Sequence, residues 1–77
     1  MMAARAYILI ETQVGKSPDV AAALRALAGV PSVDIITGDF DIIALVEAPD
    51  MVSMADLVTG QVQSISGVTR TITCVTA

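Results

Sequence analysis

The chain contains no histidine and no tryptophan, and cysteine, tyrosine and phenylalanine occur once each. Histidine is the side chain that most often acts as a general acid or base near neutral pH, and it is also the commonest metal ligand. No metal-ligand spacing, glycine-rich phosphate loop or nucleophile beside a base takes its place. The sequence therefore predicts no catalytic residue and no metal or cofactor site. Cys74 has no second cysteine with which to form an internal disulfide, which fits a reducing compartment.

Basic residues are also scarce. Arg5, Lys16, Arg25 and Arg70 stand apart from one another against eight acidic residues, so the net charge is −4. A protein that binds nucleic acid needs clustered basic side chains to displace phosphate counterions, and the sequence has no such cluster. The longest apolar runs are far shorter than the roughly 18 residues that span a bilayer, and no signal peptide opens the chain. We expect a cytoplasmic protein without direct nucleic-acid or membrane partners.

Apolar residues, in contrast, are abundant. Hydrophobic side chains make up 55% of the 77 residues, against the roughly 45–50% of an ordinary globular domain. A chain of this length has room for one domain, residues 1–77, and a monomer of that size buries only roughly 60% of its unfolded surface. Part of the apolar surplus is therefore expected to be buried against other chains.

Hydrophobic periodicity and turn residues divide the chain into strands and helices. Runs of β-branched and apolar residues predict strands at residues 4–12, 33–37, 40–48 and 68–75. Apolar residues at helical spacing predict helices at residues 18–28 and 53–64. Ser17 is expected to cap the first helix, with Pro18 as its first residue. Gly38 and Asp39 are expected to form a two-residue turn between the second and third strands.

The predicted strands differ in how their apolar residues are distributed. Strands 4–12 and 40–48 are apolar on both faces and should be central, whereas strands 33–37 and 68–75 alternate with polar residues and should lie at the edges. The resulting order, 4-1-3-2, is that of the α+β ferredoxin-like βαββαβ fold, a four-stranded antiparallel sheet with both helices on one face. The other face would expose apolar side chains of the central strands. We therefore expect two sheets to pair face to face, as in dimeric α+β barrels.

One short segment is the clearest candidate for chemistry. In residues 37–41, Thr-Gly-Asp-Phe-Asp, two carboxylates flank an aromatic ring in a tight turn. Carboxylates accept hydrogen bonds from an ammonium group, and backbone N–H groups exposed at a glycine can hold an anion. A hairpin turn with solvated acids would use the same residues, so both interpretations stay open. Thr69, Thr71 and Thr73 form a row of hydroxyls on one face of the last strand, which β-propensity explains equally well.

Three segments resemble, in order and spacing, the RAM domain, which is the carboxyl-terminal effector-binding domain of the leucine-responsive/asparagine-responsive (Lrp/AsnC) family of transcriptional regulators. They are residues 7–10 (Tyr-Ile-Leu-Ile), 37–42 (Thr-Gly-Asp-Phe-Asp-Ile) and 65–73 (Ile-Ser-Gly-Val-Thr-Arg-Thr-Ile-Thr). The resemblance implies that sheets pair into homodimers, that dimers assemble into rings of about eight to ten subunits, and that a free amino acid binds between dimers. Carried over by position, the implied amino-acid site comprises Gly38, Asp39, Phe40, Asp41, Thr71 and Thr73.

The chain departs from that family in one respect. Typical members carry a helix-turn-helix domain before this one, whereas this sequence begins directly at the first predicted strand. We expect a stand-alone form that cannot bind DNA itself. Whether it co-assembles with a full-length Lrp/AsnC regulator and alters the response of that regulator stays open. Two other functions stay open. A cofactor-free enzyme of the dimeric α+β barrel type would want a histidine or a buried acid, and a structural adaptor would use residues 37–41 only as a turn.

Overall fold

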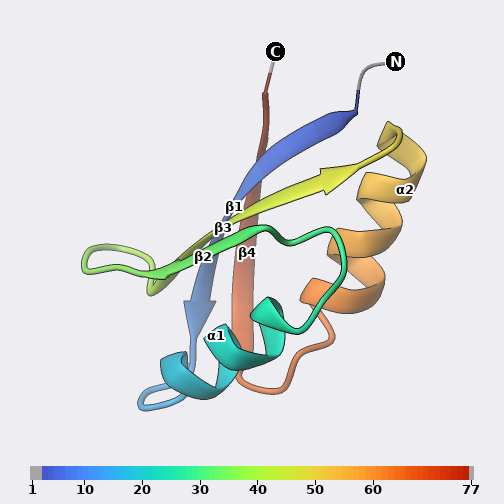
Figure 1. The fold of residues 1–77 in the computed structure, drawn as a ribbon. Helices are drawn as coiled ribbons and strands as arrows, with labels where there is room; N and C mark the ends of the chain where they lie inside the picture. The colour runs from blue at the N-terminus through green and yellow to red at the C-terminus, as the bar shows by residue number, and fades with distance from the viewer. Residues whose placement is uncertain (1–2, 77) are drawn as a thin grey trace.

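The computed structural model describes residues 3–76, which form a four-stranded sheet with helices packed on one of its faces (Figure 1). The elements in chain order are β1 (Ala4–Thr12), α1 (Ser17–Arg25), β2 (Ser32–Ile35), β3 (Ile42–Ala48), α2 (Met51–Asp56), the π-helical segment η1 (Leu57–Val62) and β4 (Val68–Val75). All strand pairs are antiparallel, and the sheet order is β2-β3-β1-β4. The structure therefore confirms the predicted βαββαβ topology with β1 and β3 at the centre.

The core lies between the sheet and the helices. Every second residue of the two central strands points toward the helices, and Ile8, Ile10 and Ile42 are completely buried there. They pack in one cluster with Leu24 of α1 and Met54 of α2. Burial of an aliphatic side chain of this size stabilises the fold by roughly 1.5–3 kcal/mol. This cluster uses the helix-facing side of the sheet, so the remaining residues of the central strands lie on the other side.

The side of the sheet opposite the helices carries an apolar patch, which we call the open face. Its apolar members are Tyr7, Leu9, Ile43, Leu45 and Ile72. Leu9 lies between its strand partners Ile43 and Ile72, and Tyr7 lies opposite Leu45, so the patch is continuous across three strands. Tyr7 and Ile72 keep 42% and 41% of their surface exposed in the single chain. The uncovered apolar face that the strand patterns predict is thus present.

The first helix differs from its prediction at both ends. Lys16 occupies the N-cap position without a side-chain capping bond, and Ser17 is already helical. The Ser17 hydroxyl instead lies 2.9 Å from the Thr12 hydroxyl, which links the helix to the end of β1. At the other end, Leu27 N–H donates to the Leu24 carbonyl at 3.1 Å, so the chain tightens after Arg25 and the predicted continuation to residue 28 is wrong.

The second helix starts earlier than predicted and changes its winding. Asp50 caps it, since its carboxylate accepts a hydrogen bond from Ser53 N–H at 2.8 Å, and the helix begins at Met51 rather than at residue 53. Beyond Asp56 the chain continues as η1, in which Gln63 N–H donates to the carbonyl five residues back, at 2.9 Å. Gly60 lies inside this wider segment, where a glycine weakens the ordinary α-helical register.

Candidate functional site

The loop between β2 and β3 is longer than predicted. Ile36 N–H donates to the Asp41 carbonyl at 2.8 Å, and this bond closes a loop of residues 37–40. The predicted two-residue turn at Gly38 and Asp39 is therefore wrong, because β2 ends and β3 begins two residues farther from the loop tip. Gly38 has φ of +149°, and nothing lies near the position of a Cβ atom. Its backbone conformation, rather than crowding, requires glycine.

Asp41 joins this loop to the end of β1. Its half-buried carboxylate accepts a hydrogen bond from Thr12 N–H at 2.8 Å, and the Thr12 hydroxyl lies 3.4 Å from the same oxygen, Oδ2. Its own N–H donates to the Ile10 carbonyl at 2.9 Å. A bond from a peptide N–H to a carboxylate is charge-assisted and stronger than one between neutral groups. Asp41 therefore anchors the loop on the central strand.

Asp39 has a different environment. It lies on the exposed part of the loop, next to Gly38, and its carboxylate makes no hydrogen bond or ion pair within residues 3–76. Thr37 is exposed as well. The loop tip therefore presents one unpaired carboxylate beside open backbone, which is an arrangement suited to an ammonium group.

Phe40 contacts a basic residue, Arg70, that is not among the predicted site residues. The Arg70 guanidinium carbon lies 4.9 Å from the centroid of the Phe40 ring, within the range of a cation–π interaction. Arg70 comes from β4, where it pairs with Glu11 of β1. No sequence pattern pointed to this contact, because it joins the loop before β3 to β4, which lies two strands away from β3 in the sheet.

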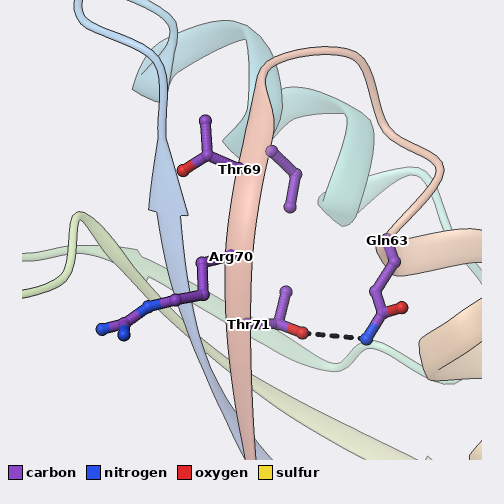
Figure 2. Close-up of a pocket in the computed structure, with 5 residues that line it drawn as sticks. Gln63, Thr69, Arg70 and Thr71 are labelled. Atoms are coloured by element: carbon purple, nitrogen blue, oxygen red, sulfur yellow. Dashed lines mark hydrogen bonds between the residues drawn. The ribbon is translucent and has the colours of Figure 1, made fainter.

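Thr71 lies at the same end of the sheet, on the side of the helices. Ile10 is the strand partner of both Ile42 and Thr71, which places Thr71 two strands away from the start of β3. Its hydroxyl accepts a hydrogen bond from Gln63 Nε2 at 3.0 Å (Figure 2). Gln63 follows η1 directly, so its approach to β4 could not be predicted from a regular helix.

An open hollow of about 320 Å³ lies between the end of η1 and β4. Its lining consists of Gln63, Val68, Thr69, Arg70 and Thr71 (Figure 2). Thr73 lies two residues farther along β4 and is exposed outside this lining. The structure thus brings Phe40 to Arg70 and Thr71 to Gln63, but it joins neither Asp39 nor Thr73 to them by any bond within the described chain.

The predicted row of three hydroxyls is interrupted. A register irregularity at the end of β1 pairs Glu11 with Arg70 and Thr12 with Val68, so Thr69 has no strand partner. Its hydroxyl donates to Glu11, at 3.1 Å to the carbonyl and 2.8 Å to Oε1. Figure 2 shows Thr69 and Thr71 extending in opposite directions from the strand. The prediction that Thr69 shares a face with Thr71 is therefore wrong.

A second hollow, of about 480 Å³, lies at the opposite end of the sheet. Its charged lining residues are already engaged. Arg5 pairs with Glu47 at 3.2 Å, and Asp50 caps α2. Within residues 3–76 no three His, Cys, Asp or Glu side chains are grouped to hold a metal ion. None of the helices in the same range has the length and apolar character needed to cross a membrane.

Comparison with protein families gives a match over nearly the whole chain. Residues 5–76 match the model of the Lrp/AsnC ligand binding domain. Among curated proteins, no sequence matches.

Three solved structures illustrate the likeness in fold. TTHA0845 from Thermus thermophilus is 31% identical, with a TM-score of 0.91 over 96% of this chain and 92% of that one. Hypothetical protein PHS023 from Pyrococcus horikoshii is 25% identical, with a TM-score of 0.91 over 99% and 90% of the two chains. The transcriptional regulator NMB0573 from Neisseria meningitidis, solved as its complex with L-Met, is 21% identical, with a TM-score of 0.86 over 96% of this chain and 49% of that one.

Proposed function

Because this chain belongs to the Lrp/AsnC ligand-binding domain family, we propose that it is an oligomeric sensor of a free amino acid. The proposed function is binding rather than catalysis. The proposed site comprises Gly38, Asp39, Phe40 and Asp41 of the loop, with Thr71 and Thr73 of β4 approaching from the edge of the sheet. A ligand held there would act on assembly, or on a full-length regulator that co-assembles with this chain in the cytoplasm.

The observation that carries this proposal is the unpaired Asp39 carboxylate on an anchored loop. An amino acid needs an acceptor for its ammonium group, and a charge-assisted bond of that kind contributes roughly 1.5–3 kcal/mol. The loop is held to the sheet by bonds at Asp41 and Ile36, so it offers the carboxylate at a defined place. The L-Met complex of the Neisseria meningitidis regulator, whose fold is similar, supports an amino acid as the ligand class.

The open face supports assembly of several chains. The exposed parts of five apolar side chains on neighbouring strands would leave water if two sheets paired, and each would contribute a fraction of the roughly 1.5–3 kcal/mol of complete burial. A second contact between dimers would then close the hollow beside Thr71, which a single chain leaves open. We propose a homodimer through the open face and a larger ring, of about eight to ten subunits, built from dimers.

A calorimetric screen of the twenty common L-amino acids against the whole chain tests the proposal. We expect one or a few of them to bind at or below millimolar concentration, and light scattering to show a mass of several chains that changes with the bound amino acid. If no amino acid produces heat at millimolar concentration, the sensor function is wrong. A gel-shift titration run in parallel should show no binding to duplex DNA at physiological salt, since the net charge is −4.

A further inference from the structure

We propose that the two acids of the loop divide their work: Asp41 is a positioning residue that sets the loop on β1, and Asp39 is the carboxylate that receives the ammonium group of the ligand. This inference rests on the proposed function for its ligand, and on the bonds of Asp41 for its geometry. It gives different roles to two carboxylates that the sequence places together in one candidate ligand site.

Asp41 forms hydrogen bonds inside the chain through its N–H, its carbonyl and its carboxylate. Its N–H donates to Ile10 at 2.9 Å, and its carbonyl accepts from Ile36 at 2.8 Å. Its carboxylate accepts from Thr12 N–H at 2.8 Å. These partners belong to β1 and to the end of β2, so Asp41 sits where the loop, β1 and β2 meet. Loss of the bond to its carboxylate would remove one link between the last residue of β1 and the loop.

The Asp41 carboxylate faces two neutral donors, the peptide N–H of Thr12 and the Thr12 hydroxyl. A neutral donor can be satisfied by the amide oxygen of asparagine as well as by a carboxylate oxygen, because both accept in similar geometry. Positioning therefore needs an acceptor at residue 41, but it does not need a negative charge there.

Asp39 has the reverse requirements: a negative charge, but no bond to the fold. Its side chain is exposed and makes no bond within residues 3–76, so the fold does not depend on it. An ammonium ligand, in contrast, gains most from a full charge on its acceptor. Asparagine at residue 39 would keep the shape of the side chain and remove the charge. The same substitution thus has opposite expected effects at the two positions.

The link from Asp41 continues to the first helix. Thr12 Oγ1 lies 2.9 Å from Ser17 Oγ at the start of α1, a helix with no side-chain cap. Replacing Thr12 by valine removes this hydroxyl and keeps the N–H that bonds Asp41. Thr12→Val is therefore a control. It tests whether the hydrogen bond from the Thr12 peptide N–H to Asp41 positions the loop, rather than the contact between the Thr12 and Ser17 hydroxyls.

The experiment compares Asp41→Asn, Asp41→Ala and Asp39→Asn in the whole chain. The probe is whichever of the twenty common L-amino acids binds the unchanged chain most tightly in calorimetry. We expect Asp39→Asn to weaken binding by roughly 10- to 150-fold with an unchanged Tm. Asp41→Asn should bind within about threefold of the unchanged chain, whereas Asp41→Ala should lower the Tm by about 5–20 °C and weaken binding. Thr12→Val should bind like the unchanged chain.

Two results would overturn the division of work. The first is that Asp41→Asn loses as much affinity for the ligand as Asp39→Asn and keeps its Tm. That result would mean that the charge of Asp41 contacts the ligand. The second is that Asp41→Ala leaves both the Tm and the amide exchange rate of Thr12 unchanged. That result would mean that Asp41 does not position the loop on β1. The second result needs no ligand, so the positioning role of Asp41 is decided even if no amino acid binds and the proposed function fails.

Discussion

At Gly29 the chain passes so close to β3 that a side chain has no room. Gly29 has φ of +86°, and a Cβ atom there would lie 2.9 Å from the Glu47 carbonyl oxygen. Gly15 has a similar φ of +79° but open space around it, which makes it a matched control. We expect Gly15→Ala to lower the free energy of unfolding by roughly 1–2 kcal/mol, from the left-handed backbone alone. Gly29→Ala should lower the free energy of unfolding further. Denaturant titration measures both values, and equal decreases for the two variants would contradict this prediction.

The carboxylate of Asp50 makes the stability of the fold depend on pH. Its pKa is lowered, first because its carboxylate accepts from the Ser53 backbone N–H and next because it bonds the Ser53 side chain. Because this pKa is lower in the folded state than in the unfolded state, the charged form stabilises the fold above the unfolded pKa of about 4. This stabilisation is lost as the pH falls below that value and through the folded pKa. Asp50→Ala should therefore reduce the Tm at pH 7, and this difference should shrink below about pH 4. Circular dichroism melts at several pH values would contradict this by showing a constant difference.

Among the elements, β1 and β4 have the boundaries that the sequence predicts, because β1 has an apolar centre of Tyr-Ile-Leu-Ile and β4 is rich in β-branched residues. The boundaries of β2 and β3 were less predictable, since the bond between Ile36 and Asp41 takes residues from both strands into the loop. The candidate site shows the same limit. Asp39 and Asp41 were identifiable as a pair, but the different roles that we propose for them rest on the bond of Asp41 to Thr12, which is distant in sequence. Gln63 and Arg70 reach the site region only through the winding of η1 and the fold of the loop.

The π-helical segment η1 offers a test at the same scale. Gly60 lies within it without a positive φ, and nothing approaches the position of a Cβ atom. Gly60→Ala should therefore raise the free energy of unfolding by roughly 0.5–1 kcal/mol, because it reduces the freedom of the unfolded chain without a clash. Urea titration measures the change. A loss of stability would mean that η1 needs the freedom of glycine to keep its wide winding.

At the scale of the whole molecule, the open face leads us to predict the mass of the assembly in solution. Leu45→Glu places a charge within the open face, opposite Tyr7, where burial without a partner is costly, and light scattering should show a shift toward single chains. Val52→Glu is the control, since Val52 is an apolar residue of α2 that is 74% exposed and lies away from the open face. The control should keep the mass of the unchanged chain. Equal masses for both variants would show that the chains assemble through another surface.

The central position of β1 also bears on how the chain is made and folds. β1 pairs with β3 on one side and with β4 on the other, and the Thr69 bond to Glu11 spans 58 residues. During synthesis β1 emerges first, and one of its edges stays without a partner until the last strand has left the ribosome. Closing so long a loop is slow compared with forming a local hairpin. Until then, that edge of β1 offers unpaired backbone N–H and C=O groups beside apolar side chains, and such an edge is open to wrong pairing.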